Sequence, residues 1–125
     1  MIIYLATPIR PRNGKNVEEN VKAAKALALE LWKQGYTVIC PAANTDLPIS
    51  LAEKELDVLR WLNGDIEILQ RCDAMVVAPD WEKSDGVRGE LVCARMYDIP
   101  VYFYPDIPFL KIDKTVLCIK NGGNL

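Results

Sequence analysis

The chain has 125 residues, of which 50% are hydrophobic and 26% are charged, and its formal net charge is -2. These values predict one globular domain over residues 1–125 with enough apolar side chains for a core. They exclude a basic surface for a nucleic-acid polymer, and the apolar runs are far shorter than a membrane span. Because no basic segment precedes the first apolar residues, we expect a strand there instead of a signal peptide, and a cytoplasmic location.

The residue types that are absent or rare limit the chemistry further. The chain has no histidine, which is the commonest metal ligand and the usual general base. Catalysis would therefore have to use carboxylates, Tyr, Ser, Arg or Lys. The four cysteines have wide spacing and apolar neighbours, which predicts reduced core thiols at Cys40, Cys72, Cys93 and Cys118.

The first part of the chain shows a strand, a helix and a second strand. Residues 2–6 form an apolar run that predicts a strand, and the polar residues 7–15 predict a loop. A helix then begins at Asn16, which has a glutamate three residues later as in a capping box, and ends at Gly35. A second strand is predicted over residues 36–40, and it ends before Pro41.

The rest of the chain continues the alternation of helix and strand. Ser50 and Glu53 suggest another helix cap, followed by helical sequence to about Arg71 with an interruption near Asn63 and Gly64. The further predicted elements are a strand over residues 74–78, a helix over 87–97, a strand over 101–104 and a possible fifth strand over 114–120.

This alternation predicts an α/β fold with three layers, α/β/α. Strands that read as continuous apolar runs between helices indicate a central parallel sheet covered on both faces, and we expect a flavodoxin-like (Rossmann-like) strand order. Such sheets bind ligands beyond the carboxyl ends of the strands, where the strand order reverses. The two most polar loops follow the first and third strands, at residues 7–16 and 79–86, so the site is expected there.

One carboxylate lies on the apolar face of a predicted helix. Within residues 87–97, Glu90 has small or apolar neighbours three and four positions away, whereas two arginines mark the solvent side. An unpaired carboxylate is costly to bury, so Glu90 either complements the helix dipole or faces a cleft. The second alternative makes it a catalytic carboxylate suited to glycosidic chemistry, in which one acid attacks the anomeric carbon and a second serves the leaving group.

Four aspartates are candidates for the second acid. Asp65 could instead cap a helix over residues 66–70, and Asp73 could fix a turn before the third strand. Asp80 and Asp85 lie in the predicted cleft loop, where either could simply be solvated. The local sequence does not choose between these alternatives.

The same two loops contain groups that could hold an anion or a base. Arg10 and Arg12, with Ser84 and Gly86 at the start of a helix, could bind a phosphate, although loop arginines are often solvated and Ser84 could act as a helix cap. Trp81 is a large aromatic residue in a polar loop, which suits stacking on a base or on a partner surface. A flavin, phospho-receiver or Walker-type phosphate site is not predicted, because the loops lack the required residues.

Three stretches together resemble the nucleoside 2-deoxyribosyltransferase superfamily. They are Tyr4-Leu5-Ala6-Thr7-Pro8-Ile9-Arg10, Asp65 to Asp73, and Ser84-Asp85-Gly86-Val87-Arg88-Gly89-Glu90. Their order and spacing match over most of residues 1–104. The Ser-x-Gly-x-x-x-Glu form and the Tyr-to-Arg spacing at the start look closer to the 2'-deoxynucleoside 5'-phosphate N-hydrolases than to the transferases. The Trp81-x-x-Ser84-x-Gly86 variant resembles small bacterial and phage members.

The resemblance implies a role for individual residues. Glu90 matches the nucleophile, Asp65 the acid that assists departure of the base, and Tyr4 the tyrosine beside the nucleophile. Arg10 and Ser84 match positions associated with the 5'-phosphate. The implied substrate contacts are Thr7, Pro8, Ile9, Arg10, Trp81, Ser84, Asp85 and Gly86. A homodimer or larger homo-oligomer is implied, and no cofactor or metal is expected.

The leading hypothesis is therefore an enzyme that cleaves or transfers the N-glycosidic bond of a (deoxy)nucleoside or its 5'-monophosphate. Water as acceptor would make it a hydrolase, and a second base would make it a transferase. A different class is a non-catalytic nucleotide-binding or sensing module on the same fold. A third is a protein-interaction domain in which Trp81 is the main contact.

Overall fold

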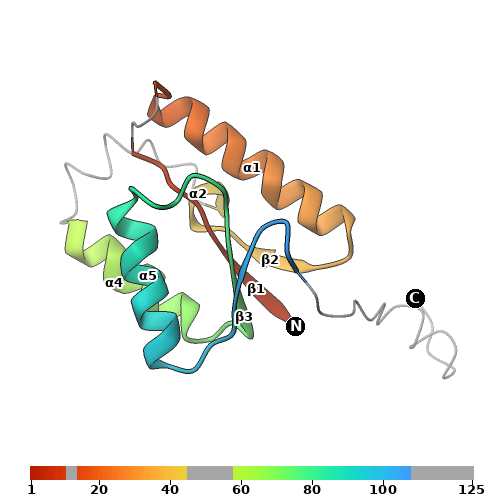
Figure 1. Cartoon of the computed structure of the whole chain (residues 1–125), viewed down its shortest axis with the longest axis vertical. Helices are drawn as coiled ribbons and strands as arrows, with labels where there is room; N and C mark the ends of the chain where they lie inside the picture. The colour runs from red at the N-terminus through yellow and green to blue at the C-terminus, as the bar shows by residue number, and fades with distance from the viewer. Residues whose placement is uncertain (11–13, 45–57, 108–125) are drawn as a thin grey trace, which may run out of the picture.

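The computed structural model of the chain describes residues 1–10, 14–44 and 58–107. In this part of the chain, helices and strands alternate as the sequence predicts (Figure 1). The elements are β1 (Ile2–Ala6), α1 (Val17–Lys33), β2 (Thr37–Ile39), α2 (Pro41–Asn44), α4 (Val58–Leu69), β3 (Ala74–Val77), α5 (Asp85–Met96) and β4 (Val101–Phe103). None of the described helices is long and apolar enough to cross a bilayer.

The four described strands form one parallel sheet in the order β2-β1-β3-β4. β1 is therefore central, and the chain crosses from β2 over β1 to reach β3. This is the flavodoxin-like order predicted from the sequence, and it places the reversal of strand order between β1 and β3. The predicted α/β fold with a parallel sheet is confirmed.

Side chains of β1 alternate between the two faces of the sheet, because successive residues of a strand point to opposite sides. Ile3 and Leu5 pack with the buried residues of α1, whereas Tyr4 and Ala6 pack with those of α4 and α5. Figure 1 shows α1 on one side of the strands and α4 and α5 on the other. The three layers follow from this division, and Tyr4 lies in the layer shared by α4 and α5.

Two helices begin with the capping residues that the sequence indicates. The Asn16 side-chain oxygen accepts a hydrogen bond of 2.9 Å from the backbone N–H of Glu19 at the start of α1. Ser84 does the same for α5, where its hydroxyl oxygen accepts from the Val87 N–H at 3.3 Å. α5 consequently begins at Asp85, two residues before the predicted start.

The structure differs from the local predictions in two elements. α4 continues through Asn63 and Gly64 without the predicted interruption, so Asp65 lies inside the helix and does not cap it. One interior glycine costs a helix only about 1 kcal/mol, which packing of the amphipathic helix offsets. The chain after β2 forms the short helix α2, with Pro41 at its first position, where a missing N–H costs nothing.

Some sequence predictions concern residues outside the described ranges. These are the cap at Ser50 and Glu53, the fifth strand over residues 114–120, and the environments of Arg12 and Cys118. Of the described cysteines, Cys40 and Cys72 are buried, Cys93 is partly buried, and all three are free thiols.

Candidate active site

The two loops that the sequence singled out start side by side at one edge of the sheet. β1 and β3 pair in register with Ala6 opposite Val77, and the N–H of Ala78 donates to the Ala6 carbonyl at 3.0 Å. Residues 7–10 and residues 78–84 therefore leave the sheet next to each other. α5 begins directly after the second loop, so its first turns lie near the same carboxyl edge.

Glu90 lies in the second turn of α5 and is largely enclosed by the protein. Burial, with a smaller contribution from the nearby charge of Asp65, raises its pKa from the ordinary 4.5 to about 7. Donation from the Tyr4 hydroxyl acts in the opposite direction, because it favours the ionised carboxylate. Close to neutral pH, Glu90 is therefore poised between its two protonation states.

Tyr4 places a hydroxyl group beside Glu90 from the middle of β1. The side chain is fully buried, and no group lies within the distance and angle limits of a hydrogen bond to its hydroxyl. The hydroxyl is nevertheless close enough to Glu90 for the two groups to influence each other's pKa. Burial, followed by the charges of Glu90 and Asp65, raises the pKa of Tyr4 far above its usual value. Tyr4 therefore remains protonated and can donate to a carboxylate.

Asp65 completes the group from α4, which packs against α5. Burial raises the pKa of Asp65 from 3.8 to about 6. Its charge acts on both Tyr4 and Glu90, so the three side chains form one electrostatically coupled cluster. We call Tyr4, Asp65 and Glu90 the acidic cluster. It unites three elements that are distant in sequence: β1, α4 and α5.

The other three aspartates do not join the acidic cluster. Asp73 lies at the opposite, amino-terminal edge of the sheet, where its carboxylate accepts from the Ile2 N–H at 2.6 Å. This is the turn-fixing role that the sequence left open. Asp80 and Asp85 are exposed, and Asp80 has a φ of 63°, a left-handed conformation that aspartate tolerates better than most residues. Of the four aspartates considered, Asp65 is the one that contributes to the cluster.

The first loop contains four predicted substrate contacts in different environments. Thr7 is partly buried, with its hydroxyl 4.0 Å from the Cys40 sulfur, and Pro8 is buried. Ile9 packs against the hydrophobic cluster on the α1 face of the sheet, whereas Arg10 is exposed. Of these four residues, Arg10 is the one that presents a charged side chain to solvent.

The second loop contains Trp81, Ser84, Asp85 and Gly86. Trp81 is partly buried on the α4 and α5 face and packs on Phe103, with ring centroids 5.3 Å apart and planes inclined by 37°. It therefore belongs to the edge of the core, and part of its ring is already covered. Ser84 is the N-cap of α5, Asp85 is exposed in its first turn, and a side chain at Gly86 would meet no atom within 4 Å.

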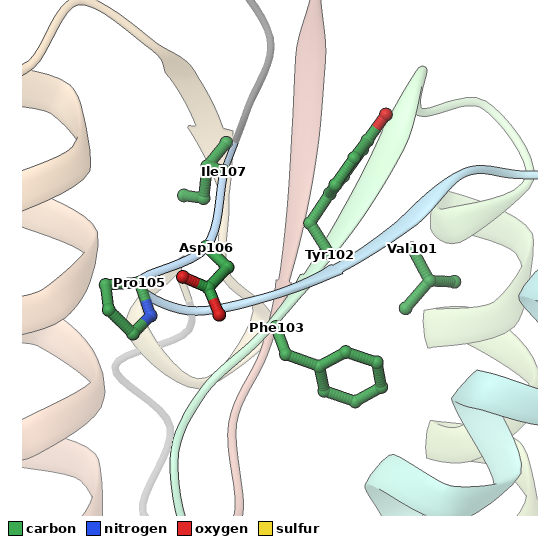
Figure 2. A pocket seen from close by; sticks show the side chains of 6 residues that line it. All are labelled: Val101, Tyr102, Phe103, Pro105, Asp106 and Ile107. Carbon is green, nitrogen blue, oxygen red and sulfur yellow. The ribbon is translucent and has the colours of Figure 1, made fainter.

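An open groove of about 540 Å³ lies beside the second loop, along β4 and the turn that follows it, and Phe103 of its lining packs on Trp81 (Figure 2). Tyr102 and Phe103 project to opposite sides of the strand there. The groove lining contains no member of the acidic cluster: it consists of Val101, Tyr102, Phe103, Pro105, Asp106 and Ile107. Within the described ranges, no three Cys, Asp or Glu side chains lie close enough together to hold a metal ion.

Sequence reasoning missed one residue of the first loop's environment, Asn20 of α1. It is buried, and its side-chain NH2 group donates to the carbonyls of Ile9 and Arg10 at 2.9 and 3.0 Å. The sequence does contain a sign of this role, because Asn20 lies next to the apolar stripe of α1 that includes Ala24 and Ala28. A polar side chain at such a position requires a hydrogen-bond partner.

Comparisons with known proteins agree with this fold. The chain is similar in structure to a 2-deoxyribosyltransferase from the psychrotolerant bacterium Bacillus psychrosaccharolyticus, with a TM-score of 0.58 at 20% sequence identity. The match covers 93% of this chain and 80% of that one, which confirms the predicted resemblance at the level of the fold. A comparison with curated proteins finds no match. Residues 1–103 match the family described as "Domain of unknown function (DUF4406)", and the chain therefore belongs to that family.

Proposed function

We propose that this protein cleaves or transfers the N-glycosidic bond of a (deoxy)nucleoside or its 5'-monophosphate, with Glu90 as the nucleophile. The observation that carries the proposal is the acidic cluster, in which two carboxyl groups with raised pKa values and a buried tyrosine hydroxyl come together. Pairs of carboxyl groups whose pKa values are shifted by burial are typical of glycosidic chemistry. The structural likeness to a 2-deoxyribosyltransferase supports the same class of reaction.

In the first step, an oxygen of ionised Glu90 forms a bond to C1' while the bond from C1' to the base nitrogen breaks. The electron pair of that bond leaves with the base, and protonated Asp65 supplies a proton to it. Tyr4 donates its hydroxyl to Glu90 and orients the carboxylate. The product of this step is a glycosyl ester on Glu90 and a free base.

In the second step, an acceptor attacks C1' and Glu90 leaves as a carboxylate. Asp65, now ionised, takes the proton of the acceptor and returns to its starting state. Water as acceptor gives a free sugar, and a second base gives a new nucleoside. The proposal includes both outcomes, because the groups of the acidic cluster serve either acceptor equally.

The proposal is tested by base release from pooled nucleosides, deoxynucleosides and 5'-monophosphates, measured by chromatography with and without an added acceptor base. Glu90-dependent release establishes glycosidic chemistry, and exchange onto the acceptor separates transfer from hydrolysis. Saturable nucleotide binding without release, retained in Glu90→Gln, would contradict the enzyme and favour a nucleotide-binding module. In that case the same residues would bind a nucleotide without cleaving it.

We place the 5'-phosphate between Arg10 and the start of α5. Arg10 is exposed on the first loop, and the α5 N-terminus adds the backbone N–H groups of its first turn and the positive end of the helix dipole. Trp81, Ser84 and Gly86 form the opposite side of this subsite in the proposal. The remaining proposed substrate contacts are Thr7, Pro8, Ile9 and Asp85.

Arg10→Ala is expected to lower kcat/KM for a 5'-monophosphate about 10²-fold, because one charge-assisted contact to phosphate is lost. The corresponding nucleoside should be affected less than about 3-fold, since it has no phosphate to lose. Steady-state kinetics on matched nucleoside and monophosphate pairs measure the difference. Arg88→Ala is the control, because Arg88 is an exposed arginine on α5. Equal losses for both substrates of a pair would refute the phosphate assignment.

We further propose a cytoplasmic homodimer that forms through the outward face of α5. Val92 and Met96 on this face are 57% and 70% exposed. Gly89 lies on the same face, and a Cβ atom added there would meet no atom within 4 Å, so the described part of the protein gives no steric reason for a glycine. A glycine inside a helix costs about 1 kcal/mol relative to alanine. Close approach of a second chain would account for that cost.

A second copy fits this face because α5 is complementary to itself in charge. Its first turn carries Asp85 and its last turn carries Arg95. When two copies of α5 pack antiparallel around a two-fold axis, Asp85 of each lies near Arg95 of the other, as an isologous interface requires. In this register Val92 lies over the backbone near Gly89 of the opposite copy, and Met96 lies over the start of its α5.

Gly89→Ala is expected to stabilise the isolated subunit by up to about 1 kcal/mol and to weaken the dimer at least about 10-fold, because the added methyl group separates the helices. Sedimentation equilibrium gives the dimer Kd, and chemical denaturation below that Kd gives subunit stability. Met96→Lys should dissociate the dimer outright, whereas Leu29→Lys, at a 55% exposed position on α1, should not. A dimer unaffected by Met96→Lys would exclude this face.

A further inference from the structure

Asn20 is the buried polar residue of the described part of the chain, with 4% of its surface exposed. Its NH2 group donates to the carbonyl oxygen of Ile9 at 2.9 Å and to that of Arg10 at 3.0 Å. Both partners are acceptors only, so the amide nitrogen and not the amide oxygen must face the loop. One side chain thus fixes two consecutive peptide groups.

The position of Asn20 makes this contact a link between a rigid element and an irregular one. Asn20 lies in the first turns of α1, whose start is capped by Asn16 and whose Ala24 and Leu31 are buried in the core. Its own N–H donates to the Asn16 carbonyl at 3.1 Å, so the backbone of Asn20 is part of the helix. Ile9 and Arg10 belong to no helix or strand, and they follow β1 at the edge where the acidic cluster lies.

We propose that Asn20 is a positioning residue that orients Arg10 toward the 5'-phosphate of the substrate. The inference rests on the proposed function. In this proposal Asn20 touches no substrate itself, but it favours 5'-monophosphates over nucleosides by its effect on Arg10. Holding the Ile9 and Arg10 carbonyls against α1 fixes the direction in which the Arg10 side chain leaves the loop. A misplacement of such a group by about 1 Å can cost a large part of its contribution to rate.

Asn20→Asp tests the contact with little change in shape, because it replaces the NH2 donor with an oxygen that repels both carbonyls. We expect kcat/KM for a 5'-monophosphate to fall about 10-fold, mainly through KM, and that for the nucleoside to change less than about 2-fold. Asn20→Ser, which keeps one donor and no charge, should give a smaller loss of the same pattern. Circular dichroism and Tm confirm that each variant is folded.

The matched control is Asn16→Asp, which adds the same charge one turn earlier at a cap position where aspartate serves as well as asparagine. It should leave both substrates unchanged. The decisive measurement is a double-mutant cycle with Arg10→Ala: in that background Asn20→Asp should cause no further loss with the monophosphate. Additive losses, or equal losses with both substrates, would overturn the inference while leaving the proposed function intact. Absence of base release from the wild-type protein would overturn both.

Discussion

Glu90→Gln is expected to reduce base release about 10³-fold or more and, at the same time, to make the folded protein more stable above pH 7. The first effect follows because the amide cannot act as the nucleophile. The second follows because burial raises the pKa of Glu90 to about 7, so the ionised group is unfavourable in the folded state. A residue present for structural reasons would show the opposite effect on stability.

The sign of the stability effect depends on pH in a defined way. Between about pH 4.5 and 7, the unfolded chain has released the Glu90 proton whereas the folded chain still holds it, so wild-type stability falls as pH rises. The full difference corresponds to about 3 kcal/mol. Glu90→Gln should therefore match wild type near pH 4 and have a Tm higher by about 10 °C at pH 8.

Calorimetry of both proteins across this pH range measures the effect. Glu67→Gln is the control variant, because Glu67 is exposed on α4 in an ion pair of 3.6 Å with Arg71, and such pairs contribute little. It should change Tm by no more than a degree or two at any pH. A Glu90→Gln protein that is less stable than wild type at pH 8 would make Glu90 a structural residue.

The sheet and its order follow from the sequence because they depend on patterns that extend along each element. The apolar strands and the capping residues Asn16 and Ser84 mark the element boundaries to within a few residues. Alternation along β1 also predicts that Tyr4 faces one layer and Ile3 the other. These are local rules, and the packing of the sheet agrees with them.

The acidic cluster depends on tertiary packing, so the local sequence alone could not assemble it. Asn63 and Gly64 look like a helix break, which would make Asp65 a cap, whereas the packed helix α4 continues through them. The family resemblance grouped Tyr4, Asp65 and Glu90 where the local pattern left four aspartates open. The polar loop around Trp81 suggests an aromatic residue outside the core, but Trp81 packs on Phe103 of a strand that follows it by about 20 residues.

A second large effect on the rate of base release is expected when Asp65 is replaced. The pH dependence of the rate distinguishes the role of Asp65 as the acid from that of Glu90 as the nucleophile. With pKa values of about 6 and 7 in one coupled pair, base release should have a bell-shaped pH profile with limbs near those values. The productive form has Glu90 ionised and Asp65 protonated, and it is the minor of the two singly protonated forms because Glu90 has the higher pKa. Asp65→Asn should lower the rate about 10²–10⁴-fold and remove the alkaline limb.

The acidic limb that remains in Asp65→Asn belongs to Glu90 alone and should lie below about 7, because the variant lacks the Asp65 charge that helps to raise the pKa of Glu90. A substrate whose base needs no proton provides the control. In 7-methyl-2'-deoxyguanosine the base is already cationic and leaves as a neutral molecule, so Asp65→Asn should cleave it almost as fast as wild type does. An equal loss on this substrate and on 2'-deoxyguanosine would exclude proton donation by Asp65 and leave it a role in holding the base.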